Sequence, residues 1–238
     1  MSRLAIIPAR GGSKRIPRKN IKPFLGKPII GYAIETALAS GTFAEVMVTT
    51  DDDEIAEVAR SFGAEVPFRR SRTASSDQAT TLTALTEVLE RYGERNRYFS
   101  EVCCIYATSP FVTTDLLHRG LRLLLEREFD SVFPVIRYGH PVQRGLELDT
   151  SGKMSLLSPE YVNVRSQDLT PTYHDAGMFY WFRPKPVHAA GALWTKNSGC
   201  IPISELEAQD IDTEVDWKLA ELKYQMLRDE QAAGNLSG

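Results

Sequence analysis

Short apolar runs alternate with helical patterns over the first 135 residues of the chain. The apolar runs cover residues 4–9, 45–50, 64–68, 101–107 and 130–135, and the helical patterns between them cover residues 28–40, 55–62, 82–92 and 114–127. Strands that are joined through helices lie parallel in one sheet, with right-handed crossovers. The alternation therefore predicts an α/β fold with a mostly parallel sheet, in which ligands bind beyond the carboxyl ends of the strands.

The alternation is lost after Val135. Residues 136–171 contain short alternating runs between turn residues, namely Gly139, Pro141, Gly145, Asp149 and Gly152. This pattern predicts an antiparallel excursion, which serves as a dimer arm, as a substrate lid, or only as a surface hairpin. An aromatic strand at 178–182 and an amphipathic helix ending near residue 227 follow. The length and the 42% hydrophobic content predict a single domain over 1–238, with an inserted arm at about 136–171.

The N-terminal segment concentrates positive charge. The first 30 residues contain eight Lys or Arg and no Asp or Glu, although the chain has a net charge of -3. Gly11 and Gly12 follow the first predicted strand, and we expect them to adopt unusual dihedrals that bring backbone N–H groups close to an anion. Lys14, with Arg10 or Arg15, would neutralise phosphate oxygens there. The pattern matches neither a Walker A loop nor G-x-G-x-x-G, so we interpret it as another polyphosphate cradle, or as a solvated or nucleic-acid-binding basic loop.

The C-terminal segment carries the opposite charge. From residue 201 onward there are nine Asp or Glu and three Lys or Arg. If residues 209–212 are extended, the side chains of Asp210 and Asp212 point the same way. Two carboxylates on one face suit Mg²⁺, which completes its shell with water and substrate phosphates. The alternative is that Asp212 or Thr213 only caps the final helix.

Further polar candidates lie at predicted strand ends and in loops. Asp51 follows the strand at 45–50 and would share the ligand-binding edge with the N-terminal cations. Asp77 or Thr80 either caps the helix that begins near residue 82 or, together with Arg70, donates and accepts hydrogen bonds with the base and sugar of a ligand. His174 is a weaker catalytic candidate, because a single histidine beside a strand is usually structural.

Bulk properties restrict the partners and the compartment. The sequence pI of about 5.9 argues against general attraction to nucleic acid or anionic membranes. No apolar run reaches the ~20 residues that span a bilayer, and the N-terminus has no signal-peptide pattern, so we expect a cytoplasmic protein. Cys103, Cys104 and Cys200 fit neither a disulfide framework nor a zinc site, and we expect all three to be reduced packing residues.

Several segments resemble a known family. Residues 7–20 (IPARGGSKRIPRKN) resemble the N-terminal signature of the cytidylyltransferases that activate sialic-acid-type nine-carbon sugars as CMP derivatives, and residues 209–217 (QDIDTEVDW) resemble the acidic motif of that family. Four further segments resemble the pseudaminic acid branch of the family, namely VCCIY at 102–106, SVFPV at 131–135, RSQDL at 165–169 and YHDAG at 173–177. The resemblance covers nearly the whole chain.

This resemblance implies a Rossmann-like nucleotidyltransferase fold, Mg²⁺ dependence, and a homodimer whose inserted arm reaches the active site of the neighbouring chain. The residues implied in CTP binding are Arg10, Gly11, Gly12, Ser13, Lys14, Lys19, Asn20, Arg70 and Asp77. Lys14, Asp212 and Arg10 are the implied catalytic residues, and Asp210 and Asp212 are the implied metal ligands. The sugar acid is implied to bind near Gln167, Tyr173 and Ser109.

The same resemblance implies that CMP is transferred from CTP to the anomeric hydroxyl of a nine-carbon 2-keto acid such as pseudaminic acid, with release of pyrophosphate. Sialic acid members commonly carry Pro-Thr-Ser-Pro-Leu-Arg where this chain has ATSPFV at 107–112, so the arginine is absent. This difference argues against ordinary sialic acid. The alternatives within the class are N-acetylneuraminic, legionaminic and Kdo acids. Two alternatives belong to other functional classes. One is a non-catalytic nucleotide sensor, and the other is a glycosyltransferase, for which Asp51-Asp52-Asp53 offers an Asp-x-Asp motif.

Overall fold

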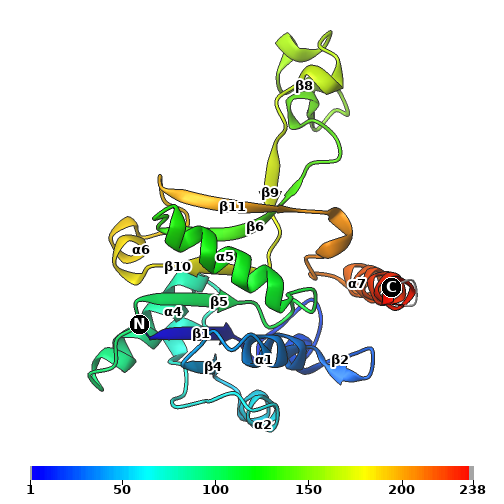
Figure 1. Cartoon of the computed structure of the whole chain (residues 1–238). Helices are drawn as coiled ribbons and strands as arrows, with labels where there is room; N and C mark the ends of the chain where they lie inside the picture. Colours follow the sequence, from blue (N-terminus) through cyan, green and yellow to red (C-terminus); the bar gives the residue numbers. More distant parts are fainter. Residues whose placement is uncertain (1, 236–238) are drawn as a thin grey trace.

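A mixed seven-stranded sheet forms the centre of the computed structural model, which describes residues 2–235 (Figure 1). The strand order is β11-β6-β10-β5-β1-β4, with β9 paired to β6. The strands are β1 (Arg3–Pro8), β4 (Glu45–Thr49), β5 (Glu101–Ile105), β6 (Ser131–Arg137), β9 (Tyr173–Asp175), β10 (Phe179–Phe182) and β11 (Ser198–Ile203).

Five of the seven strands of this sheet run in the same direction, and β9 and β10 run against them. Leu4 of β1 is in register with Glu45 of β4 and with Val102 of β5, and β11 runs parallel to β6. β10 lies antiparallel between β5 and β6, so β6 runs in the same direction as β5. The carboxyl ends of β1, β4, β5 and β6 therefore share one edge, and the predicted α/β, mostly parallel class is confirmed.

Helices cover both faces of the sheet, so the domain has three layers (Figure 1). Ala5 and Ile7 of β1 belong to one core with residues of α1 (Ile29–Ala39), α2 (Asp53–Ser61), α5 (Thr114–Glu126) and α7 (Glu214–Asn235). Leu4 and Ile6 belong to the other core, with α4 (Thr81–Gly93) and α6 (Pro184–Ala190). Because successive side chains of a strand point to opposite faces, a continuous apolar strand supplies both cores.

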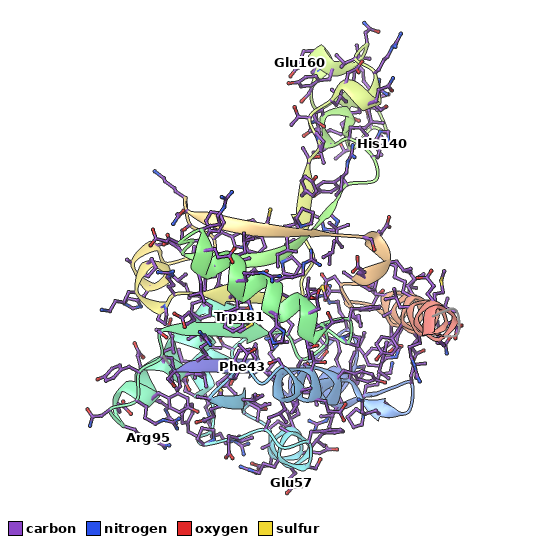
Figure 2. The ribbon with its side chains drawn as sticks, in the orientation of Figure 1. Phe43, Glu57, Arg95, His140, Glu160 and Trp181 are labelled. Carbon is purple, nitrogen blue, oxygen red and sulfur yellow. The ribbon has the colours of Figure 1, made fainter. Side chains whose placement is uncertain are left out.

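The packing between α5 and the sheet depends on a close approach at Gly120. A Cβ on this residue would lie 2.7 Å from Cδ1 of Trp181. Trp181 is fully buried, stacks on Phe43 with ring centroids 5.1 Å apart, and donates its indole N–H to the carbonyl of Leu117 at 3.0 Å (Figure 2). The aromatic strand at 178–182 is therefore a core strand.

An arm projects from the edge of the sheet that carries the carboxyl ends of β1, β4, β5 and β6, because β6 ends there (Figure 1). Its base is the antiparallel pair β6 and β9, and its outer part contains the hairpin of β7 (Leu146–Leu148) and β8 (Met154–Leu156) with three short 3₁₀ turns (Figure 1). Figure 2 shows Glu160 and His140 on this arm, far from Trp181. The arm occupies the segment in which the sequence predicts an antiparallel excursion.

Some elements differ from the sequence predictions. Residues 64–68 form no strand; Glu65 makes a single parallel bridge to Met47, and Pro67 supplies no N–H for a longer ladder. The short helices α3 (Arg72–Ser75) and α6, and the edge strand β11, were not predicted. Cys103 and Cys104 are buried as expected, but Cys200 is exposed, because it lies on the outward face of that edge strand.

Within residues 2–235, no helix combines the length and the apolar character that crossing a bilayer requires.

Candidate active site

A cavity of about 630 Å³ opens at the carboxyl edge of the sheet. Its walls come from the loop after β1, the loop after β5, residues 70–81 and the segment before α7. The predicted site residues that line it are Arg10, Ser13, Lys14, Lys19, Asn20, Arg70, Asp77, Asp210 and Asp212. The fold thus brings the basic loop after β1 and the acidic segment before α7 together, as their opposite charges suggest.

Asp51 and Asp52 hold the glycine turn in place. The N–H of Gly11 donates to Oδ1 of Asp51 at 3.0 Å, and a Cβ on Gly11 would lie 2.7 Å from Oδ2 of Asp52. Neither Gly11 nor Gly12 has a positive φ, so the expectation of unusual dihedrals is wrong. Gly11 is instead required for close approach, and its N–H is already used by Asp51.

The three consecutive aspartates have structural partners. Asp52 caps α2 by accepting from the N–H of Ile55 at 3.0 Å, and it also accepts from the guanidinium of Arg18. Hydrogen bonding to Arg18 lowers the pKa of Asp52 to about 2. Asp53 pairs with Arg69. The two acids of the Asp-x-Asp motif, on which the glycosyltransferase alternative rests, therefore already have partners: Asp51 accepts from Gly11, and Asp53 pairs with Arg69.

Asp77 faces the N-terminal cations. It accepts from Arg10 at 3.1 Å and from Lys14 at 2.5 Å, and the hydrogen bond from Lys14 lowers the pKa of Asp77. Thr80 caps α4 instead, because its Oγ1 accepts from the N–H of Thr83 at 3.2 Å. The alternative that Asp77 is only a helix cap is therefore wrong.

Asp210 and Asp212 both line the cavity, and Ile211 between them is buried. Burial raises the pKa of Asp210, and the nearby charge of Asp212 raises it further. The final helix is capped by Thr213, which exchanges hydrogen bonds with Asp216. The carboxylate of Asp212 is not used as a cap and accepts from Arg15 at 2.7 Å.

The donor set at these two aspartates fits Mg²⁺. Carboxylate oxygens are hard ligands, and Mg²⁺ is usually bound by one or two of them together with substrate phosphates. Among residues 2–235 there is no group of three or more His, Cys, Asp or Glu arranged to hold a metal ion. The chain therefore offers two carboxylates, beside an open cavity with room for water and phosphate.

The nucleoside candidates form the inner wall of the cavity. Arg70 is 7% exposed and donates to the hydroxyl and the carbonyl of Thr49, and burial lowers its pKa. The side-chain amide of Asn20 donates to the carbonyl of Arg10 at 2.9 Å. Sequence reasoning missed Tyr106 and Thr81, whose hydroxyl groups lie 3.3 Å apart in this wall. The position of Tyr106, directly after a central strand, is the signal that could have identified it.

The sugar candidates do not meet the CTP candidates within one chain. Ser109 is buried, donates to the carbonyl of Gly177 at 3.2 Å, and is absent from the cavity wall. Gln167 lines a separate cavity of about 480 Å³ on the arm, and Tyr173 is exposed on β9. The ring Nδ1 of His174 lies 2.9 Å from the carbonyl of Asp175, away from the cavity.

Comparison with known proteins identifies the family. A family model for cytidylyltransferases matches residues 4–187, which is most of the chain. The chain belongs to the cytidylyltransferase family. The family and the enzyme class expected from the sequence, a nucleotidyltransferase, are confirmed.

Curated relatives of this cytidylyltransferase match over nearly its full length. The pseudaminic acid cytidylyltransferase of Campylobacter jejuni is 38% identical over 226 residues, covering 95% of this chain and 97% of the relative. The CMP-N,N'-diacetyllegionaminic acid synthase of Legionella pneumophila is 30% identical, covering 92% and 94%. The N-acylneuraminate cytidylyltransferase A of Danio rerio is 35% identical, but only 49% of its own length is covered.

A solved structure supports the fold of this cytidylyltransferase. The CMP:2-keto-3-deoxy-manno-octonic acid synthetase complexed with CTP aligns with a TM-score of 0.68 and 18% identity, covering 96% of this chain and all of the other. At this identity the likeness concerns the fold alone. The Rossmann-like nucleotidyltransferase fold implied by the resemblance is confirmed.

Proposed function

We propose that this cytidylyltransferase transfers CMP from CTP to the anomeric hydroxyl of a nine-carbon 2-keto sugar acid, and that the acid is pseudaminic acid. The anomeric oxygen attacks the α-phosphorus, the bond from this phosphorus to the bridging oxygen breaks, pyrophosphate leaves, and the hydroxyl proton passes to solvent. The observation that carries the proposal is the meeting of N-terminal cations and C-terminal acids in one cavity. The 38% identity to the Campylobacter enzyme, over nearly the full length of both chains, supports the choice of pseudaminic acid.

The charge of the cavity suits a metal-bound nucleoside triphosphate. Five cationic and three carboxylate side chains line it, leaving two surplus positive charges: Arg10, Lys14, Arg15, Lys19 and Arg70 against Asp77, Asp210 and Asp212. CTP with one divalent cation carries about two negative charges near neutral pH. Phosphoryl-transfer enzymes work mainly by positioning and charge stabilisation, which this distribution can supply without a protein nucleophile.

In this proposal Arg10, Ser13 and Lys14 bind the triphosphate, and Asp77 keeps Arg10 and Lys14 in place until the triphosphate displaces it. Asp210 and Asp212 hold Mg²⁺, which when bound would neutralise phosphate charge and lower the pKa of the attacking hydroxyl. Asn20 and Arg70 bind the nucleoside side of CTP.

We also propose a homodimer in which the arm of one chain completes the sugar site of the other. Nine of the sixteen exposed large hydrophobic residues among those described lie at 138–173, on the arm and at its base. An apolar projection of this size fits contact with a second copy. Gln167 and Tyr173, which lie on the arm and at its base, would then reach the neighbouring cavity. Two buried reduced cysteines, Cys103 and Cys104, fit a cytoplasmic enzyme.

The test is pyrophosphate release with CTP, Mg²⁺ and a panel of pseudaminic, N-acetylneuraminic, legionaminic and Kdo acids. We expect the highest kcat/KM with pseudaminic acid, with formation of the CMP sugar. A higher kcat/KM with another of these acids would contradict the substrate. CTP binding without turnover would indicate a sensor, and consumption of a sugar nucleotide would indicate a glycosyltransferase.

A further inference from the structure

The N-terminal segment contacts the segment that carries the two aspartates and the first turn of α7. Lys19 donates from Nζ to the carbonyl of Ile211 at 2.6 Å. Farther along, Phe24 packs edge-on against Trp217 with ring centroids 5.7 Å apart. Lys22 lies between these two contacts. The N-terminal segment thus contacts the acidic segment at successive points.

Lys22 makes the most extensive of these contacts. Its Nζ donates to both carboxylate oxygens of Glu214, at 2.8 and 2.7 Å, and lies 4.6 Å from the ring centroid of Trp217. Glu214 is the first residue of α7. Trp217 follows three residues later, at the end of the first helical turn, and its side chain is buried in the core. The ammonium therefore joins an ion pair and a cation–π contact on the same helical turn.

The position of the aspartates depends on that turn. Residues 209–212 belong to no helix and no strand of the described chain. The N–H of Asp212 donates to the side chain of Asp216 in α7 at 3.1 Å, and the carbonyl of Ile211 accepts from Lys19. A shift of the first turn of α7 would therefore carry Asp212 with it.

We infer that Lys22 is a positioning residue, which clamps the first turn of α7 and so holds Asp210 and Asp212 at the cavity wall beside the N-terminal cations, where the two carboxylates would bind a divalent cation. This inference rests on the proposed role of the two aspartates as metal ligands. Groups that orient metal ligands from behind typically change metal affinity by about 10- to 100-fold when removed. Lys22 itself does not line the cavity.

The chain offers a matched control in Lys27. It pairs with Glu35 and lies 3.8 Å from the ring centroid of Tyr32, and its side chain is 30% exposed, against 29% for Lys22. The two lysines thus make the same kinds of contact with similar exposure. The ion pair of Lys27 fixes α1, whereas that of Lys22 fixes α7. Exposed ion pairs contribute little to global stability, so neither K22M nor K27M should lower Tm by much.

The experiment measures metal binding directly. Mn²⁺ is titrated, with detection by electron paramagnetic resonance, against full-length protein saturated with α,β-methylene-CTP. Affinity for the nucleotide alone is measured by calorimetry in EDTA. We expect K22M to weaken Mn²⁺ binding about tenfold and to leave nucleotide affinity in EDTA unchanged, whereas K27M leaves both unchanged. E214Q should reproduce part of the loss, and the exchange K22E/E214K should restore part of the affinity.

Three outcomes would overturn the inference. K22M and E214Q binding Mn²⁺ like the wild type would exclude the clamp, and E214Q alone decides the question if K22M does not fold. Equal losses in K22M and K27M would indicate a general loss of packing. Wild-type protein that binds no Mn²⁺ together with the nucleotide would instead overturn the proposed metal role, and the clamp with it.

Discussion

Asp212 is the residue whose charge matters most for the proposed chemistry. It lines the cavity, accepts from Arg15 and is not needed to cap α7. We predict that D212N lowers kcat about 100- to 1,000-fold, because an amide keeps the shape but removes the charge that binds the metal. Pyrophosphate release measures this, with D229N on the exposed part of α7 as the control. Near-normal turnover in D212N would exclude the metal role.

Asp52 gives a pH-dependent prediction. Its pKa is lowered to about 2 by Arg18, against about 3.9 in an unfolded chain. A lowered folded pKa contributes stability that is present above pH ~4 and is lost as the pH falls toward 2. D52N should therefore cost about 1 kcal/mol at pH 7, after allowance for solvent screening of this partly exposed pair. Urea unfolding at pH 7 and pH 2.5 measures it, and a deficit of equal size at both values would contradict the assignment.

At the residue scale, the sequence predicts where charged residues gather, but not which residues they contact in the fold. Eight cations without an acid predicted the cradle, and the spacing of Asp210 and Asp212 predicted the pair of carboxylates. The sequence left open whether Asp77 or Thr80 caps α4, because both residue types cap helices well. Only the fold shows that Asp77 faces Lys14 across 63 positions of sequence.

At the scale of elements, the loop between β1 and α1 gives a matched pair of substitutions. A Cβ on Gly11 would lie 2.7 Å from Oδ2 of Asp52, which is held by Arg18, whereas a Cβ on Gly12 would meet nothing within 4 Å. We predict that G11A destabilises the protein by about 1–3 kcal/mol, and that G12A has little effect on stability. Chemical denaturation of both variants measures the difference. Equal stability of the two would show that the turn does not depend on this contact.

Element prediction succeeded where one pattern dominated. Apolar runs predict the buried strands β1, β4 and β5, and helical periodicity of apolar residues predicts the amphipathic helices α1, α4 and α5. β11 was missed, because its edge position exposes alternate residues and Pro202 interrupts the apolar run. The short run at 64–68 predicts a strand, but only Glu65 pairs with a neighbouring strand, through its bridge to Met47.

At the scale of the whole molecule, the sequence showed that alternation stops at residue 136 but not where the arm would point. The direction follows from β10, which lies antiparallel between β5 and β6 and so keeps β6 parallel to the central strands. As a result the arm leaves the same edge that carries the cavity. That relation depends on topology, which no local pattern contains.

The arm can be removed without cutting the sheet, because the N–H of Tyr138 donates to the carbonyl of Thr172 at 3.0 Å. We predict that replacing residues 139–171 with a short Gly-Ser linker gives a monomer, since this removes seven of the nine exposed large hydrophobic residues at 138–173. CTP binding should persist, because the cavity residues lie outside the arm. Sedimentation and calorimetry measure the two properties. A dimer that survives the deletion would contradict the role of the arm.

If each cavity is completed by the arm of the other chain, two inactive variants should complement one another. A chain carrying Q167A and Y173A has an intact cavity but a defective arm, whereas a chain carrying D212N has an intact arm but a defective cavity. A mixed dimer then contains one site in which both parts are intact and one in which both are defective. After co-refolding, half of the dimers are mixed, so we expect about a quarter of wild-type pyrophosphate release, while each parent alone stays near zero. Activity that stays at the parental level in the mixture would show that each chain supplies its own sugar site.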